Sequence, residues 1–224
     1  MKKNRTMKVA ALLLALTLMT SCFVGGTFAK YTTTGGAANE TARVAKWGVE
    51  ITAEGGLFSK TYMDVNNGNI AGIANLSVSS SDSMSVVAPG TKNEEGLTFT
   101  LTGTPEVKVD VDIEVTATDI VVPKDAVTAL TEDYYPVVFT LKNGAGEELV
   151  KGKLSEVETF LEGLSDSYEA ETNLAKIGNN TDGIYVLTWE WAFENNDAAD
   201  TYLGNQETAQ TVVFGISITV EQLD

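Results

Sequence analysis

The chain has 224 residues, of which 31 are Asp or Glu, 15 are Lys or Arg and none is His. Four of the basic residues lie among the first eight, so the rest of the chain has 11 basic against 31 acidic residues and a net charge of about −20. Such a charge excludes nucleic acid as a partner, because binding to phosphates requires a basic surface. Without His there is no Ser–His–Asp triad, no Cys–His pair and no HExxH zinc site.

The N-terminal segment has the layout of an export signal. Residues 1–8 are basic, residues 9–24 are almost wholly apolar, and the small residues Thr27 and Ala29 precede Lys30. This order predicts a secretory signal peptide that is cleaved after Ala29. The apolar run is short for a membrane span. We therefore expect a protein that is secreted to the extracellular matrix or the cell surface, with no integral membrane segment after cleavage.

Cys22, the only cysteine, leaves a second processing route open. The segment Met19-Thr20-Ser21-Cys22 resembles a lipoprotein processing site, at which the cysteine itself is lipidated. Cleavage after Ala29 instead removes Cys22, and the exported chain then has no disulfide, thiol nucleophile or thiolate metal site.

The exported chain divides into a short leader and one domain. Residues 30–43 are mostly small and polar, and predict a flexible leader or a donor strand. Residues 44–224 alternate between apolar and polar side chains in several segments, which is typical of half-buried antiparallel strands. These segments are 45–51, 97–101, 107–115, 135–141, 187–193 and 212–220. The pattern predicts a mainly β protein of seven or eight strands, an antiparallel β-sandwich of jelly-roll or immunoglobulin-like type.

Two local signals refine this prediction. Asn143-Gly144 predicts a tight hairpin turn in which Gly takes a positive φ. One short helical excursion is expected near residues 155–164, with Ser155 and Glu158 as a capping box. Its apolar stripe follows at helical spacing. The stripe consists of Val157, Phe160, Leu161 and Leu164.

Three carboxylates follow one face of the strand predicted at 107–115. Asp110, Asp112 and Glu114 alternate with valines and an isoleucine, as the solvated face of any half-buried strand does. Two alternatives stay open: a carboxylate pair for glycoside hydrolysis, and a cation bridge between subunits. We expect the solvated face, and therefore no enzyme and no catalytic residue.

Oxygen-rich loops and aromatic residues give two further candidate sites. Asn195, Asn196, Asp197 and Asp200 form a loop of the kind that binds calcium, although the EF-hand pattern is absent. The segment Asp64–Gly68 is similar. We expect ordinary turns and no cofactor, with calcium as the alternative. Trp189, Trp191 and Phe193 share one strand face, which indicates core packing or, alternatively, a platform for stacking carbohydrate.

Several segments together resemble one family. They are GGTFAKYT at residues 25–32, ARVAKWGVEIT at 42–52, Val87-Ala88-Pro89-Gly90-Thr91 before the strand at 97–101, Thr201–Asn205, and the closing Ile216–Gln222. Their order and spacing resemble the TasA and camelysin group of Gram-positive bacteria, exported proteins that the signal peptidase SipW processes.

The resemblance implies a jelly-roll-like fold and head-to-tail homopolymers that form matrix fibres. In that assembly the N-terminal segment freed by cleavage inserts as a strand into the neighbouring subunit, an example of β-strand addition. The donor residues would be Lys30, Tyr31, Thr32, Thr33 and Thr34. The alternative is a monomeric surface-binding module for glycan or protein, lipidated at Cys22.

Overall fold

The computed structural model describes residues 32–36, 42–43, 48–63, 76–81, 84–193 and 196–223. The predicted signal peptide with its cleavage site between Ala29 and Lys30 lies outside this part of the chain, as do Cys22 and Tyr31.

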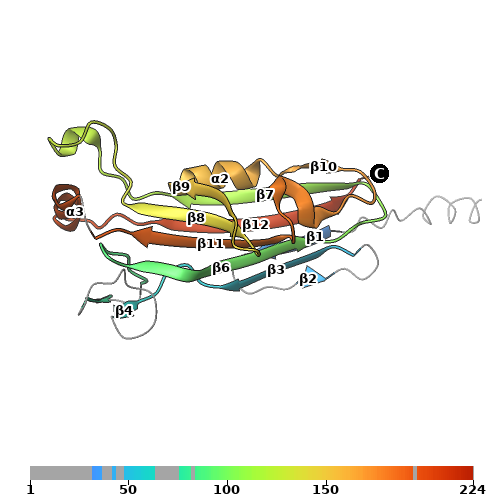
Figure 1. Cartoon of the computed structure of the whole chain (residues 1–224), viewed down its shortest axis with the longest axis horizontal. Coiled ribbons are helices and arrows are strands. Elements are labelled where there is room, and N and C mark those ends of the chain that lie inside the picture. The colour runs from blue at the N-terminus through green and yellow to red at the C-terminus, as the bar shows by residue number, and fades with distance from the viewer. Residues whose placement is uncertain are drawn as a thin grey trace, which may run out of the picture. The chain divides into compact units, whose positions relative to one another are not determined.

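The first of the two main sheets contains both the earliest and the latest described strand. Its order is β1-β12-β7-β10, and every pair is antiparallel. Neighbours in this sheet are therefore distant in sequence (Figure 1). The strands are β1 (Thr32–Gly36), β7 (Val109–Thr118), β10 (Asp166–Tyr168) and β12 (Val213–Gln222). We call this four-stranded sheet sheet A.

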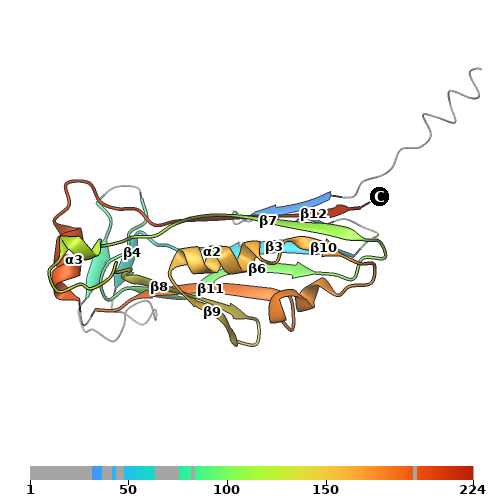
Figure 2. The ribbon, with the colours of Figure 1, turned by 90° about the horizontal axis from the view of Figure 1, so that it is seen from above.

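The second main sheet, sheet B, has six strands in the order β2-β3-β6-β11-β8-β9. It lies opposite sheet A as the other layer of a sandwich (Figure 2). Its strands are β2 (Ala42–Arg43), β3 (Glu50–Gly55), β6 (Lys92–Thr102), β8 (Val137–Asn143), β9 (Glu148–Gly152) and β11 (Ile184–Trp191). A separate small sheet pairs β4 (Thr61–Met63) with β5 (Ser77–Ser79).

The core lies between the two sheets, and the alternation along each strand determines which residues reach it. On β7 the odd-numbered residues point inward, and Val109 and Val111 are 0% and 1% exposed. On sheet B, Phe99 and Tyr185 stack with ring centroids 5.1 Å apart. Alternate residues of a strand point to opposite faces, so one face of each sheet fills the core and the other meets solvent. The predicted antiparallel β-sandwich is confirmed.

The helix α2 (Leu154–Glu162) closes one open side of the sandwich. It packs against β7 of sheet A and against β8 and β9 of sheet B. Val157 and Leu161 of the predicted stripe are fully buried, as is Leu154, which the prediction did not include. Phe160 is half-buried, and Leu164 is buried but lies beyond the end of the helix.

The cap of α2 differs from the prediction. The helix begins at Leu154, so Ser155 is already inside it and the capping box of Ser155 and Glu158 is wrong. The carboxylate of Asp119 accepts the N–H groups of Leu154 and Ser155 instead, at 2.7 and 3.1 Å. A side chain distant in sequence thus satisfies N–H groups that a helix leaves unpaired at its start.

The expectation of a single helical excursion is also wrong. A second helix, α3 (Asp197–Gly204), follows β11, and two 3₁₀ helices, η1 (Lys124–Ala126) and η2 (Leu174–Asn179), lie in connecting segments. Of the residues in α3 only Ala199 is buried, so the helix has almost no apolar stripe that a sequence pattern would reveal.

Strand boundaries and one turn also differ from expectation. The strand expected at 45–51 overlaps β3, which continues to Gly55 with Ile51 and Ala53 inward, and residues 45–47 lie outside the described part of the chain. In the hairpin between β8 and β9 the positive φ belongs to Gly146, at +84°, rather than to Gly144. The turn is wider than expected because Asn143 bonds to Glu147 through both backbone and side chain. Within the described ranges, no helix is both long and apolar enough to cross a membrane.

Candidate functional site at the edge of sheet A

β12 is the strand on which the candidate site is built, because it separates the body of sheet A from the leader. On one side it pairs with β7 over ten residues, from Val213 opposite Thr118 to Gln222 opposite Val109. Its inward residues Ile218 and Val220 are 2% and 0% exposed. The long ladder and these buried side chains hold β12 firmly to β7.

On its other side β12 pairs with β1, which the leader provides. The register runs from Thr32 opposite Glu221 to Gly36 opposite Ser217, in antiparallel sense. β1 consists of three Thr and two Gly, so it brings no large apolar side chain to this ladder. The backbone pairing is therefore the interaction that this ladder provides to β1.

The structure places part of the predicted donor segment in this ladder. Thr32, Thr33 and Thr34 lie in β1, and Lys30 and Tyr31 lie outside the described residues. Across the sandwich, β1 faces β3 of sheet B. If β1 left this position, the N–H and C=O groups of β12 on that side would have no partner, and an exposed sheet edge of this kind recruits another strand.

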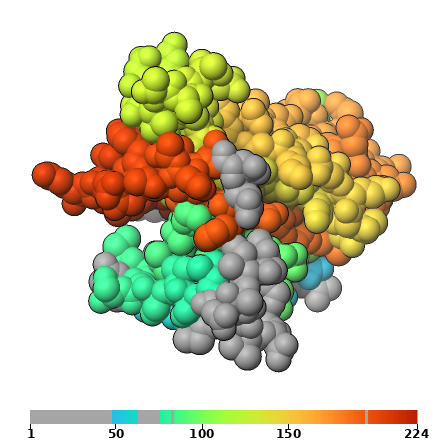
Figure 3. Space-filling model, turned by 60° about the vertical axis from the view of Figure 1, so that its left-hand side comes forward, coloured from blue at the N-terminus to red at the C-terminus, as the bar shows by residue number. Residues whose placement is uncertain are grey.

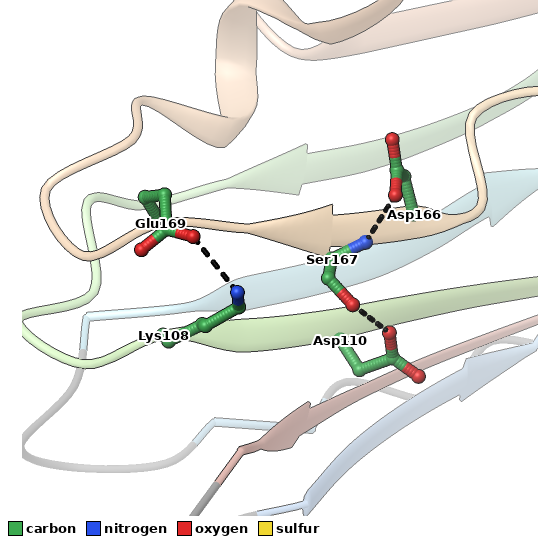
Figure 4. A network of polar contacts seen from close by, with 5 residues as sticks. All are labelled: Lys108, Asp110, Asp166, Ser167 and Glu169. Carbon is green, nitrogen blue, oxygen red and sulfur yellow. Dashed lines mark hydrogen bonds and ion pairs between the residues drawn. The ribbon is translucent and has the colours of Figure 1, made fainter.

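The predicted carboxylate stripe lies on the outer face of sheet A, as expected for a solvated strand face. Asp112 and Glu114 are exposed, and Asp110 accepts a hydrogen bond from the Ser167 hydroxyl at 2.8 Å (Figure 4). At the end of the stripe the Lys108 ammonium lies 2.8 Å from a Glu169 carboxylate oxygen. This hydrogen bond and the charge of Glu169 raise the pKa of Lys108 above its usual range.

The oxygen-rich loop is the start of α3 rather than an ordinary turn. Asn196 precedes the helix, and Asp197 and Asp200 lie in its first turn. Burial raises the pKa of Asp200, and the hydrogen bond that its carboxylate accepts from Trp191 Nε1 at 3.1 Å acts in the opposite direction. No group of three or more acidic, His or Cys side chains is arranged to hold a metal ion among the described residues. Asn195 and the segment Asp64–Gly68 lie outside them.

The three aromatic residues that were expected on one face of β11 are divided between core and surface. Trp189 and Trp191 are 2% and 5% exposed, and Trp189 Nε1 donates to the Leu57 carbonyl at 2.6 Å. Phe193 lies beyond the end of β11 and is 45% exposed. The core assignment is confirmed for the two Trp residues and is wrong for Phe193, because the strand alternation ends at Trp191.

Two polar residues that the sequence patterns did not single out fix the loops around this core. Asn93 is buried; its amide donates to the carbonyls of Gly56 and Leu57, and its oxygen accepts from Glu95 and Gly96. Asp119, the cap of α2, is the other. No local sequence signal reveals either role. The carbonyls that Asn93 binds and the N–H groups that Asp119 caps are 35 to 37 residues away in sequence, and only the N–H groups of Glu95 and Gly96 are local partners of Asn93.

Two open hollows mark the surface away from the β1 edge. One, of about 450 Å³, lies where the loop after η1 meets α2, and Tyr134, Tyr135 and Lys153 line it. Figure 3 shows this loop, in yellow-green, standing above α3 at one end of the sandwich. The Lys153 ammonium lies 4.7 Å from the centre of the Tyr135 ring, so a cation–π contact already occupies that aromatic face. The other hollow, of about 330 Å³, lies on the outer face of sheet B.

The fold and site together define an antiparallel β-sandwich whose edge strand comes from an N-terminal leader. Comparison with models of protein families, with curated proteins and with solved structures finds no match for the chain.

Proposed function

We propose that the protein is a secreted structural subunit, without enzymatic activity, that assembles into extracellular filaments by strand exchange. In the filament, β1 of one copy takes the place of β1 on β12 of the next copy. The observation that carries this proposal is the ladder between β1 and β12, in which a short leader strand of Thr and Gly completes the edge of a sheet.

The energetics permit exchange at this edge. The same backbone hydrogen bonds form whether β1 belongs to the same chain or to another copy, so the exchanged state costs little beyond the entropy of association. The remaining strands of sheet A keep their partners, because β12 retains its ten-residue ladder with β7. The linker AANET, residues 37–41, joins β1 to β2 and is the segment across which the chain would pass between copies.

Exchange of this kind generates an open chain of subunits. Each copy provides one strand and accepts another at a different surface, which is a heterologous contact that does not close on itself. Export by the predicted signal peptide supports the extracellular location, and the excess of acidic residues keeps unassembled subunits apart in solution.

Electron microscopy of two forms of the protein tests the proposal. One form begins at Lys30 and contains β1; the other begins at Ala37 and lacks β1 but keeps β2. We expect filaments from the first form and none from the second. A synthetic peptide of residues 30–36 should bind the second form, and a peptide of the same composition in scrambled order should bind less well.

Monodisperse particles from the Lys30 form, over a range of protein concentration, would contradict the proposal. That result would favour the monomeric surface-binding module instead. Filaments from the Ala37 form would contradict it as well, since they would show that assembly does not depend on β1.

A further inference from the structure

Carboxylates line the outer face of sheet A, whereas three lysines gather in one hollow on the outer face of sheet B. On sheet A the outward residues of β7 and β12 include four carboxylates, and we call this surface the acidic face. Among the described residues of β7 and β12 and position 108, which adjoins β7, Lys108 is the only outward basic residue. Its ammonium forms a salt bridge with the Glu169 carboxylate (Figure 4). β1 adds only Thr and Gly at its edge. The four carboxylates are those of Asp110, Asp112, Glu114 and Glu221.

The outer face of sheet B contains a hollow of about 330 Å³ into which three lysines project, and we call this surface the lysine face. Lys92 comes from β6, Lys142 from β8 and Lys151 from β9, and Thr140 and Thr188 lie between them. Glu94, Glu148 and Glu190 also line the hollow, so the surface is neutral overall in a chain with twice as many acidic as basic residues.

Two of these lysines have no ionic partner within the described part of the chain. Lys92 forms a salt bridge with Glu94. Lys142 stands opposite Glu148 in the β8–β9 register, yet neither Lys142 nor Lys151 comes within 4 Å of a described carboxylate. The lysine face therefore presents two ammonium groups that are available to an anionic partner.

We propose that the lysine face docks the acidic face of a second copy of this chain. Three of these carboxylates follow one another on β7 at steps of about 6.6 Å, so this row can lie over Lys142 and Lys151 between the glutamates of the hollow. A uniform polyanion would meet those glutamates along its whole length. The two faces lie on opposite layers of one sandwich, so the contact is heterologous and repeats from copy to copy.

The contact is separate from strand exchange. It uses outward side chains of β7, β8 and β9, whereas exchange uses the backbone of β1 and β12. In an assembly built by strand exchange it would join neighbouring filaments side by side. It would also join copies that do not exchange strands.

Cross-linking between single cysteines tests the contact, because the form that begins at Lys30 has no cysteine of its own. Thr140→Cys places a thiol on the lysine face, and Thr219→Cys places one beside Asp112 on the acidic face. Within one chain these positions lie on opposite outer faces. A bismaleimide that spans about 10 Å, the spacing of packed sheets, should therefore join them only between copies.

We expect a mixture of the two variants to give cross-linked heterodimers, and each variant alone to give few dimers. Lys142→Gln with Lys151→Gln in the Thr140→Cys chain should lower the cross-linked fraction by about fivefold, since charge pairs contribute strongly to such contacts. The matched control is Lys60→Gln with Lys176→Gln, which changes the net charge equally at exposed lysines elsewhere and should leave the cross-linked fraction unchanged.

Three results would overturn the inference: no heterodimer, as many dimers from either variant alone, or a yield that the Lys142 and Lys151 substitutions do not change. Binding of dextran sulfate that those substitutions abolish, without heterodimers in the mixture, would also overturn it in favour of a polyanionic partner. Filaments without cross-links would support strand exchange and contradict the contact between the two faces. Cross-links without filaments would support the contact between the two faces and contradict strand exchange.

Discussion

The sandwich has two open sides between its sheets, and a different kind of element covers each. On the side of β7, β8 and β9, α2 inserts Leu154, Val157 and Leu161, all fully buried. On the side of β12 and β3, β1 contributes a backbone ladder and a sequence of Thr and Gly. Buried apolar area is lost when a helix leaves, whereas backbone hydrogen bonds can be formed again with any strand.

Under the proposed strand exchange, this difference gives the fold one permanent side and one exchangeable side. Removal of α2 would expose the core, and no partner strand would replace its side chains. Removal of β1 would expose mainly the backbone of β12, which an identical strand from another copy can pair.

The α2 side should be the more sensitive to truncation of a side chain. Leu161→Ala removes a side chain that is 0% exposed, and should lower the free energy of unfolding by about 2–5 kcal/mol in urea titration. Leu161→Met preserves the volume and should cost less than about 1.5 kcal/mol. Equal losses in the two variants would show that packing of α2 is not what closes this side.

The cap of α2 should contribute less than its core side chains. Asp119→Ala leaves the N–H groups of Leu154 and Ser155 without their acceptor, and should cost about 1–2 kcal/mol of unfolding free energy. Ser155→Ala is the control and should cost less than about 0.5 kcal/mol, because its hydroxyl is not the cap. The opposite order would restore the capping box as the correct description.

On the β1 side we expect a small change in stability and a large change in assembly. Successive residues of an antiparallel strand direct their N–H groups to opposite sides, so only one of Thr33 and Thr34 donates toward β12. Proline at that residue should cost about 1 kcal/mol of unfolding free energy and abolish filaments. Proline at the other residue should preserve both, since edge strands tolerate it there.

Electron microscopy and urea titration of the two proline variants together would show whether assembly depends on the backbone ladder between β1 and β12. Loss of filaments in both, or in neither, would contradict a backbone ladder as the basis of assembly.

Asp200 lies in α3, outside both the α2 side and the β1 side, and provides a reference for stability effects that depend on neither side. Burial raises its pKa in the folded state, so folding disfavours the charged form and the unfolding free energy rises as pH falls through the folded pKa. Asp200→Asn keeps an acceptor for Trp191 and should be more stable than the parent at neutral pH, with a difference that narrows in acid. Urea titration at neutral and at acid pH measures the difference in unfolding free energy between the variant and the parent. A difference that widens in acid would contradict the prediction.

The regular strands could be predicted because their signal is local. β7 and β12 alternate apolar and polar residues over their whole length, and Val111 and Ile218 reach the core as expected. The helix α2 was recognisable from its stripe, since Val157 and Leu161 are four residues apart on one face.

The other features depend on partners that no local pattern identifies. Asp119 caps a helix that begins 35 residues later. β1 carries no apolar alternation, and its partner is residues 217–221 of β12, almost 200 residues later in the chain. Phe193 continues the spacing of Trp189 and Trp191 but lies beyond the end of the strand, where the alternation no longer fixes direction.

The register of β1 has a practical consequence for labelling the protein. Thr32 lies opposite Glu221, so the chain enters β1 beside the place where it leaves β12. In the proposed strand exchange, a fluorescent protein fused after residue 224 would therefore stand where the leader of another copy approaches. The loop after η1 is the better position for a tag, because residues 131–133 are exposed there, lie outside the lysine face, and loop tips accept insertions.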